Sequence, residues 1–257
     1  MAKRALWVLS LFLLLWVAPV QALDVLFIGN SYTRYSVSRI EEYRRASPRP
    51  NDYFVYEVVE GYSLAAHLNR AQTLHAIRSR KWDYVVLQDH SLQTIRFGQS
   101  FVEAMRAFNT IIRETGAQPV LFMTWARIQT NNYVNDQRTV ANAYQSMATE
   151  LNAPLLRVGE VWLDMYSNRR TTFDKMFIDD GIHPTIFGTT AVAASVMRAF
   201  HGGSLSWAPT SGTGTAGLDI IRSAVRINQV FSIPPQLGTP PPPPVSMMAI
   251  HLLLLGD

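Results

Sequence analysis

The chain has 257 residues, of which 48% are hydrophobic and 16% charged, and this apolar content excludes an intrinsically disordered protein. It contains no cysteine, which excludes disulfide scaffolds, thiolate nucleophiles, iron–sulfur clusters and cysteine-ligated zinc. The formal net charge is +4, but without the N-terminal Lys3 and Arg4 the remaining 21 basic and 19 acidic residues give only +2. This nearly neutral balance gives no electrostatic reason to expect a nucleic-acid partner.

The first 22 residues have the three parts of a secretory signal peptide. Lys3 and Arg4 form a positive start, residues 5–18 are largely apolar, and Val20-Gln21-Ala22 places small residues at a cleavage site. The apolar run is shorter than the roughly 20 residues of a membrane-spanning helix, although an uncleaved N-terminal anchor is the alternative. We therefore predict a signal peptide at 1–22 and an exported protein, periplasmic or extracellular, that meets a membrane only if this segment is retained.

Short apolar runs then alternate with longer segments of helical spacing. The runs that predict strands are 23–28, 53–59, 82–87, 119–123 and 155–158. The segments that predict helices are 34–45, 64–79, 101–115, 140–151 and 186–200. This alternation predicts an α/β fold for residues 23–202, a three-layer α/β/α sandwich with a doubly wound, mostly five-stranded parallel sheet.

The composition changes after residue 202. Residues 203–217 are rich in glycine, serine and threonine, and 216–231 have the spacing of an amphipathic helix. We therefore expect a C-terminal extension with one helix at 203–232. An unbroken proline run at 240–244 and a final apolar stretch too short to span a bilayer indicate a Pro-rich, disordered tail at 233–257.

Parallel sheets place ligands at the carboxyl ends of their strands, so the residues that follow each predicted strand are the candidates for chemistry. Gly29-Asn30-Ser31-Tyr32 follows the first strand. A serine at such a turn can present its hydroxyl where backbone N–H groups and the positive end of the next helix point. The alternative is that Ser31 only caps this helix. The G-x-S-x-G motif of α/β-hydrolases is absent from the chain.

The sequence Asp179-Asp180-Gly181-Ile182-His183-Pro184 precedes the last predicted helix of the domain. The spacing of Asp180 and His183 lets a carboxylate hold the imidazole while its other nitrogen points outward, as a catalytic base requires. One alternative is a metal site built from Asp179, Asp180 and His183. The other is a helix-capping aspartate beside a surface histidine.

Three further strand ends carry candidate residues. Gly61 follows the second strand, where a residue without a side chain lets a backbone N–H approach a ligand, although turn glycines are common. Gln88 and His90 follow the third strand, and either could donate a hydrogen bond to an oxyanion unless this is an ordinary polar loop. After the fourth strand, Trp125 could form an apolar or sugar-stacking wall and Arg127 could meet an anionic substrate group. A partly buried tryptophan and a solvated arginine explain that pair equally well.

Together and in this order, these motifs resemble the SGNH (GDSL-like) hydrolases over roughly residues 23–200. Gly29-Asn30-Ser31 is similar to the first sequence block of that superfamily, Gly61 to the second, and Asp180-x-x-His183 to the last. The resemblance implies a flavodoxin-like sandwich and a catalytic triad of Ser31, His183 and Asp180. It also implies an oxyanion hole that uses the backbone of Ser31 and Gly61.

The third block departs from the pattern of the superfamily. That block is usually Gly-x-Asn-Asp, and its asparagine completes the oxyanion hole, whereas this chain has Gln88-Asp89-His90-Ser91. Aligned directly, Gln88 takes the place of the glycine and His90 that of the asparagine. Leu-Gln-x-x-Ser resembles a less-studied branch in which Gln88 fills the role. We therefore predict Gln88 as the third oxyanion donor, with His90 as the alternative.

The resemblance implies a serine esterase that needs no cofactor and no metal, and the N-terminal segment makes it a secreted one. It would hydrolyse a small acyl ester, either a carbohydrate O-acetyl group or a lipid ester, through an acyl-enzyme. The expected partner is thus a small-molecule or glycan ester, and the oligomeric state stays open. A non-catalytic carbohydrate-binding or envelope protein on the same fold is the alternative from another functional class.

Overall fold

Five strands form one sheet in the computed structural model, which describes residues 22–129 and 132–231. They are β1 (Asp24–Gly29), β2 (Tyr53–Val58), β3 (Tyr84–Leu87), β4 (Gln118–Phe122) and β5 (Leu155–Leu156). Their order is β2-β1-β3-β4-β5, and every neighbouring pair is parallel. The predicted three-layer α/β/α sandwich with a doubly wound parallel sheet is therefore confirmed.

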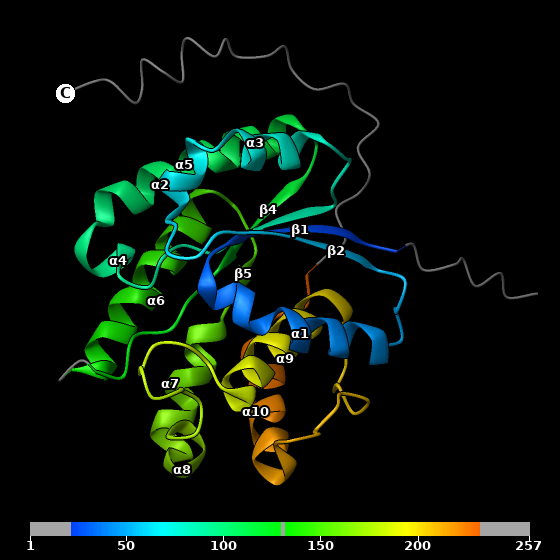
Figure 1. The fold of residues 1–257 in the computed structure, drawn as a ribbon, viewed down its shortest axis with the longest axis vertical. Coiled ribbons are helices and arrows are strands. Elements are labelled where there is room, and N and C mark those ends of the chain that lie inside the picture. Colours follow the sequence, from blue (N-terminus) through cyan, green and yellow to red (C-terminus); the bar gives the residue numbers. More distant parts are fainter. Residues whose placement is uncertain (1–21, 130–131, 232–257) are drawn as a thin grey trace, which may run out of the picture.

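Helices cover both faces of the sheet (Figure 1). On one face lie α1 (Ser31–Ala46), α7 (Val158–Asn168), α8 (Arg170–Phe173), α9 (Ile186–His201) and α10 (Gly214–Ile227). On the other face lie α2 (Leu64–Leu68), α3 (Ala71–Arg78), α4 (Gln93–Arg96), α5 (Gly98–Glu114) and α6 (Tyr133–Glu150). Each face thus has its own hydrophobic layer between the sheet and its helices.

The strands read as continuous apolar runs because both of their faces are buried. In β1, Val25 and Phe27 join the hydrophobic cluster beneath α1 and α9, whereas Leu26 and Ile28 join the cluster beneath α3 and α5. All four side chains are at most 1% exposed. Such double burial is what a parallel sheet with helices on both faces requires.

The predicted elements differ from the structure at some of their ends, in one divided helix and in the helices α4, α7 and α8, which the sequence did not predict. The predicted helix at 64–79 is two helices, α2 and α3, which are separated by Asn69 and Arg70. The fifth strand ends at Leu156, because Val158 already begins α7. Helix α7 was not predicted, although its buried residues Val158, Val161, Trp162 and Met165 have the spacing of one helix face.

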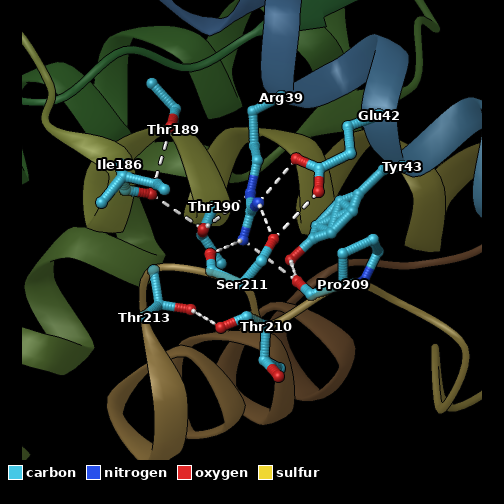
Figure 2. Close-up of polar contacts among 10 residues, drawn as sticks. All are labelled: Arg39, Glu42, Tyr43, Ile186, Thr189, Thr190, Pro209, Thr210, Ser211 and Thr213. Atoms are coloured by element: carbon cyan, nitrogen blue, oxygen red, sulfur yellow. Dashed lines mark hydrogen bonds and ion pairs between the residues drawn. The ribbon is translucent and has the colours of Figure 1, made fainter.

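The segment after α9 packs on the domain through a buried arginine of α1. Arg39 is 5% exposed and donates hydrogen bonds to Thr190 Oγ1 (3.2 Å) and to the carbonyl oxygens of Pro209 (3.0 Å) and Ser211 (3.3 Å) (Figure 2). Its charge is balanced by Glu42, 2.6 Å away. Helix α10 then buries one face in the same hydrophobic cluster as α1 and α9. Arg39 therefore joins α1, α9 and the C-terminal extension.

Two predicted segments fall outside this description. The signal peptide predicted at 1–22 lies outside the described residues except for Ala22, and the tail predicted at 233–257 lies outside them entirely. The described part of the extension contains the one helix α10. In the described ranges, no helix has the length and apolar character needed to cross a bilayer.

Candidate active site

The loops that follow β1, β2 and β3 meet at the carboxyl edge of the sheet. The register places Gly29 beside Val58 and Ile28 beside Leu87, so these strands end side by side. A cavity of about 250 Å³ opens there, lined by Asn30, Ser31, Tyr32, Tyr35, Glu60, Gly61, His90, Ser91, Arg127, Ile182 and His183. A larger cavity of about 570 Å³ lies beside β5 and residues 229–231, and none of the predicted site residues lines it. The smaller cavity is therefore the candidate active site.

Ser31 is the first residue of α1, but it does not cap this helix. The cap is Asn30, whose side-chain oxygen accepts a hydrogen bond from the Tyr32 N–H at 3.2 Å. The Ser31 hydroxyl is instead 2.8 Å from Nε2 of His183. The structure thus brings together two of the predicted site residues. Because Asn30 caps the helix, the Ser31 hydroxyl is available to bond to His183.

Asp180 holds the other side of the imidazole. Its Oδ2 is 2.6 Å from His183 Nδ1, and its Oδ1 accepts hydrogen bonds from the backbone N–H groups of Ile182 (2.8 Å) and His183 (2.9 Å). Burial alone would raise the pKa of Asp180, but these hydrogen bonds outweigh burial and lower the pKa below its usual value. Because the carboxylate accepts from Nδ1–H, Nε2 of the neutral imidazole is left to accept the proton of Ser31.

The loop that carries Asp180 and His183 is fixed by the loop that follows β4. The N–H of Ile128 donates to the Gly181 carbonyl (3.0 Å), and the indole N–H of Trp125 donates to the Ile182 carbonyl (3.0 Å). The side chain of Gln129 also donates to the Asp180 carbonyl at 2.5 Å. These contacts hold the His183 side chain against Ser31 although the loop has no regular secondary structure.

Trp125 does not form a wall for substrate, and that prediction is wrong. Its side chain is fully buried and stacks between the rings of Tyr32, at 4.3 Å, and Trp162, at 4.1 Å. The strand-end position placed it at the right edge of the sheet, but its indole points into the core and supports the His183 loop. The alternative reading of a buried tryptophan describes it better.

Ser31 and Gly61, the two residues predicted to supply backbone oxyanion donors, have N–H groups that the described part of the fold leaves unused. Gly61 has a φ of +75°, a left-handed conformation that favours glycine, and Asn30 Nδ2 fixes its loop by donating to the Tyr62 carbonyl at 2.9 Å. No hydrogen bond within the described part of the chain uses the N–H of Gly61 or of Ser31. Both residues line the cavity. The predicted pair of oxyanion donors is therefore brought to one place with its N–H groups free.

Gln88 is fully buried, and both polar atoms of its side chain form hydrogen bonds within the protein. Its Oε1 accepts from the N–H of Asn30 (3.0 Å) and from the Thr33 hydroxyl (2.8 Å), and its Nε2 donates to Asn30 Oδ1 (2.9 Å) and the Asp89 carbonyl (2.5 Å). A Cβ on Gly29 would lie 2.5 Å from this Oε1, so only glycine allows the approach. Gln88 has no free N–H for a substrate, which contradicts its predicted role as the third oxyanion donor.

His90, the predicted alternative, does line the cavity. Its Nδ1 accepts a hydrogen bond from the Leu92 N–H at 3.3 Å, so a neutral ring carries its proton on Nε2. Burial lowers the pKa of His90, and the nearby positive charge of Arg127 lowers it further. The neutral imidazole can therefore donate its Nε2–H to an oxyanion. His90 stands at the position that aligns with the asparagine of the Gly-x-Asn-Asp block.

Asp89 is a buried residue of the same loop that the sequence did not point to. Its Oδ1 accepts hydrogen bonds from the N–H groups of Leu64 (2.8 Å) and His90 (2.7 Å), which joins the loops after β2 and β3. Its Oδ2 is buried without a hydrogen-bond partner among the described residues. Burial raises the pKa of Asp89 to about 6, although the two backbone hydrogen bonds act in the opposite direction.

The remaining wall of the cavity contains Arg127, as predicted from its strand end, and Tyr35. Arg127 Nε donates to Ser91 Oγ at 3.0 Å. Tyr35 stacks on the His183 ring with the ring centres 4.6 Å apart, and it is 46% exposed. Tyr35 was missed, although its position four residues after Ser31 places both on the same face of a helix.

The alternative of a metal site at Asp179, Asp180 and His183 is not supported by the positions of these side chains. Within the described ranges, no three histidine, aspartate or glutamate side chains are grouped so that they could hold a metal ion. Asp180 and His183 instead bond to each other and, through His183, to Ser31. Their arrangement suits proton transfer from a hydroxyl.

No family model matches the sequence, and no curated protein matches it either. Solved structures do match. One is a protein of Slackia heliotrinireducens described as a candidate SGNH hydrolase, with a TM-score of 0.58 and 22% identity over 68% of this chain and 97% of that one.

Two further structures are similar over almost their whole length. The acetylxylan esterase Axe2 of Geobacillus stearothermophilus has a TM-score of 0.56 and 14% identity over 68% of this chain and 93% of that one. TesA has a TM-score of 0.51 and 18% identity over 67% of this chain and 95% of that one. The fold of this chain is therefore that of the SGNH hydrolases, as its sequence motifs predicted.

Proposed function

We propose that this protein is an exported serine esterase of the SGNH type, which hydrolyses a small acyl ester of a carbohydrate or a lipid. The observation that carries the proposal is the continuous hydrogen-bonded series from Ser31 through His183 to Asp180, at 2.8 and 2.6 Å, beside a cavity at the carboxyl edge of the sheet. The likeness to an acetylxylan esterase supports an ester as the substrate. Export rests on the sequence of residues 1–22 alone.

In the first step the Ser31 oxygen attacks the ester carbonyl carbon while Nε2 of His183 takes the hydroxyl proton. Asp180 keeps the imidazole oriented and stabilises its positive charge, because its carboxylate accepts the Nδ1–H. The product of this step is a tetrahedral intermediate with a negative charge on the former carbonyl oxygen. His183 then gives its proton to the leaving alcohol, and an acyl-Ser31 ester remains.

The negative charge of the intermediate needs donors that are already in place. The N–H groups of Ser31 and Gly61 and the Nε2–H of His90 serve this role in the proposal, and the N-terminus of α1 adds its positive dipole. A water molecule, deprotonated by His183, next attacks the acyl-Ser31 ester. Collapse of the second intermediate releases the acid and restores the Ser31 hydroxyl.

Kinetics with 4-nitrophenyl acetate and with acetylated xylooligosaccharides test this proposal. Ser31→Ala is expected to lower kcat by at least about 10⁴-fold, because a triad without its nucleophile keeps only the residual effect of the oxyanion site. Ser38→Ala, an exposed serine on the same helix, serves as the matched control and is expected to keep full activity. Unchanged turnover in Ser31→Ala would reject the serine mechanism, and loss of wild-type activity with a chelator would favour metal-dependent hydrolysis.

A further inference from the structure

The cavity beside Ser31 is lined by an arginine, Arg127, for which the described part of the chain provides no acidic partner. Arg127 lines this cavity and takes part in none of the ion pairs formed within residues 22–129 and 132–231. Its Nε donates to Ser91 Oγ at 3.0 Å, which ties the guanidinium to the loop after β3. The side chain is partly buried. Arg127 is thus a positively charged residue that lines the same cavity as Ser31 and is positioned by Ser91.

Two carboxylates at this cavity, those of Glu60 and Asp180, already have other partners. Glu60 lines the rim, but it is 3.1 Å from the guanidinium of Arg34, and its side chain is 66% exposed. The carboxylate of Asp180 is held by His183 and by two backbone N–H groups. Neither therefore balances Arg127. The charge of Arg127 reaches the reaction site, since it contributes to lowering the pKa of His90.

We infer that the substrate carries an anionic oxygen group, such as a carboxylate, close to the scissile ester, and that Arg127 binds this group. The inference rests on the proposed function, since it assigns the substrate class of the same site. A planar guanidinium can bind a carboxylate through two parallel hydrogen bonds, and partial burial strengthens the attraction. Because Arg127 and Ser31 line one cavity of about 250 Å³, the anion and the ester belong to the same small part of the substrate.

Two matched pairs of esters test the inference. The first pair, 4-acetoxybenzoate and 4-acetoxybenzamide, places the charge in the alcohol, and the second, 4-nitrophenyl hydrogen glutarate and 4-nitrophenyl pentanoate, places it in the acyl group. For each pair the measured quantity is the ratio of kcat/KM for the charged over the neutral ester. We expect a ratio of at least about 10 in one pair, since a tenfold preference corresponds to one well-formed charged contact.

Variants of Arg127 show whether this residue causes the preference. We expect Arg127→Gln to bring the ratio close to 1 and Arg127→Lys to give an intermediate ratio, because lysine keeps the charge but loses the planar fork. Arg138→Gln, which removes an exposed arginine outside the cavity, is the matched control and is expected to keep the wild-type ratio. A wild-type ratio close to 1 in both pairs, or a ratio that Arg127→Gln does not change, would overturn the inference.

A binding measurement separates this inference from the proposed function. Wild type, Arg127→Gln and Arg127→Lys, each checked for a native unfolding transition, are titrated with 4-hydroxybenzoate and 4-hydroxybenzamide and followed by NMR. Binding of the benzoate that is stronger than that of the benzamide and is lost in Arg127→Gln supports the inference, even if no ester is hydrolysed and the proposed function fails. Equal binding of both compounds, with a kcat/KM ratio close to 1 in both pairs of esters, contradicts the inference, even if neutral esters are hydrolysed and the proposed function stands.

Discussion

The hydroxyl of Ser31 lies 2.8 Å from Nε2 of His183, although 152 positions separate the two residues in the chain. Packing of two helices explains the contact. Ser31 begins α1, His183 stands three residues before α9, and the two helices pack against each other on one face of the sheet. The buried Arg39 of α1 adds a hydrogen bond to Thr190 of α9. The distance between Ser31 and His183 therefore depends on how α1 packs against α9, including contacts that lie outside the cavity.

Replacing His90 tests the assignment of the third oxyanion donor. His90→Phe keeps an aromatic ring but removes the N–H, so kcat for a small ester is expected to fall by about 10²–10³-fold. His90→Gln, which offers an amide N–H, is expected to recover part of this loss. Steady-state kinetics beside a thermal unfolding curve check the prediction. A kcat for His90→Phe within about twofold of wild type would exclude His90 from this role.

Replacing Gln88 is expected to change stability first, because its side chain serves buried groups of the fold. Gln88→Leu leaves the N–H of Asn30 and the hydroxyl of Thr33 without an acceptor. The cost of a buried unsatisfied group is about 1–3 kcal/mol, so we expect the free energy of unfolding to fall by about 3 kcal/mol. Urea denaturation measures it, with the exposed Gln99→Leu as control. Equal stability of the two variants would refute the structural role of Gln88.

The buried carboxyl of Asp89 predicts a dependence of stability on pH. Burial raises its pKa to about 6 in the folded protein, against about 3.9 in an unfolded chain. The folded state thus holds a proton that the unfolded state has lost, and the stabilisation is complete below about pH 4 and lost as the pH rises through 6. At about 1.36 kcal/mol for each pKa unit, the full effect approaches about 3 kcal/mol.

Asp89→Asn removes this dependence while keeping a carbonyl oxygen for the N–H groups of Leu64 and His90. The variant is therefore expected to be more stable than wild type at pH 7.5, and the difference is expected to close toward pH 4. Urea denaturation of both proteins at several pH values between 4 and 7.5 measures this difference. Parallel stability curves of the two proteins across that range would show that Asp89 does not titrate as its burial requires.

The sheet and the chain order of the site could be predicted from the sequence because both leave strong local signals. Strands buried on both faces are short apolar runs, and the candidate residues follow directly after them, as Ser31 follows β1. Side-chain direction leaves no such signal. Gln88 and His90 are two positions apart in one loop, and only the buried contacts of Gln88 show that it faces the core and His90 the cavity.

Trp125 was misread for the same reason. Its position after β4 is that of a residue at the cavity, but the stacking partners that bury it come from α1 and α7, which are distant in the sequence. Arg127, two residues further along, does line the cavity. Strand ends therefore identify the edge at which a site lies, while tertiary packing decides which side chain of each loop enters it.

The most direct test of the catalytic assignment is the intact mass of the folded protein after treatment with a fluorophosphonate probe, with wild type and Ser31→Ala compared. An activated serine attacks the phosphorus and displaces fluoride, so the account predicts one covalent adduct on wild type and none on Ser31→Ala. An unmodified wild type with a native unfolding transition, or an equal adduct on Ser31→Ala, would contradict the account. The first of these results would favour a non-catalytic binding protein on the same fold.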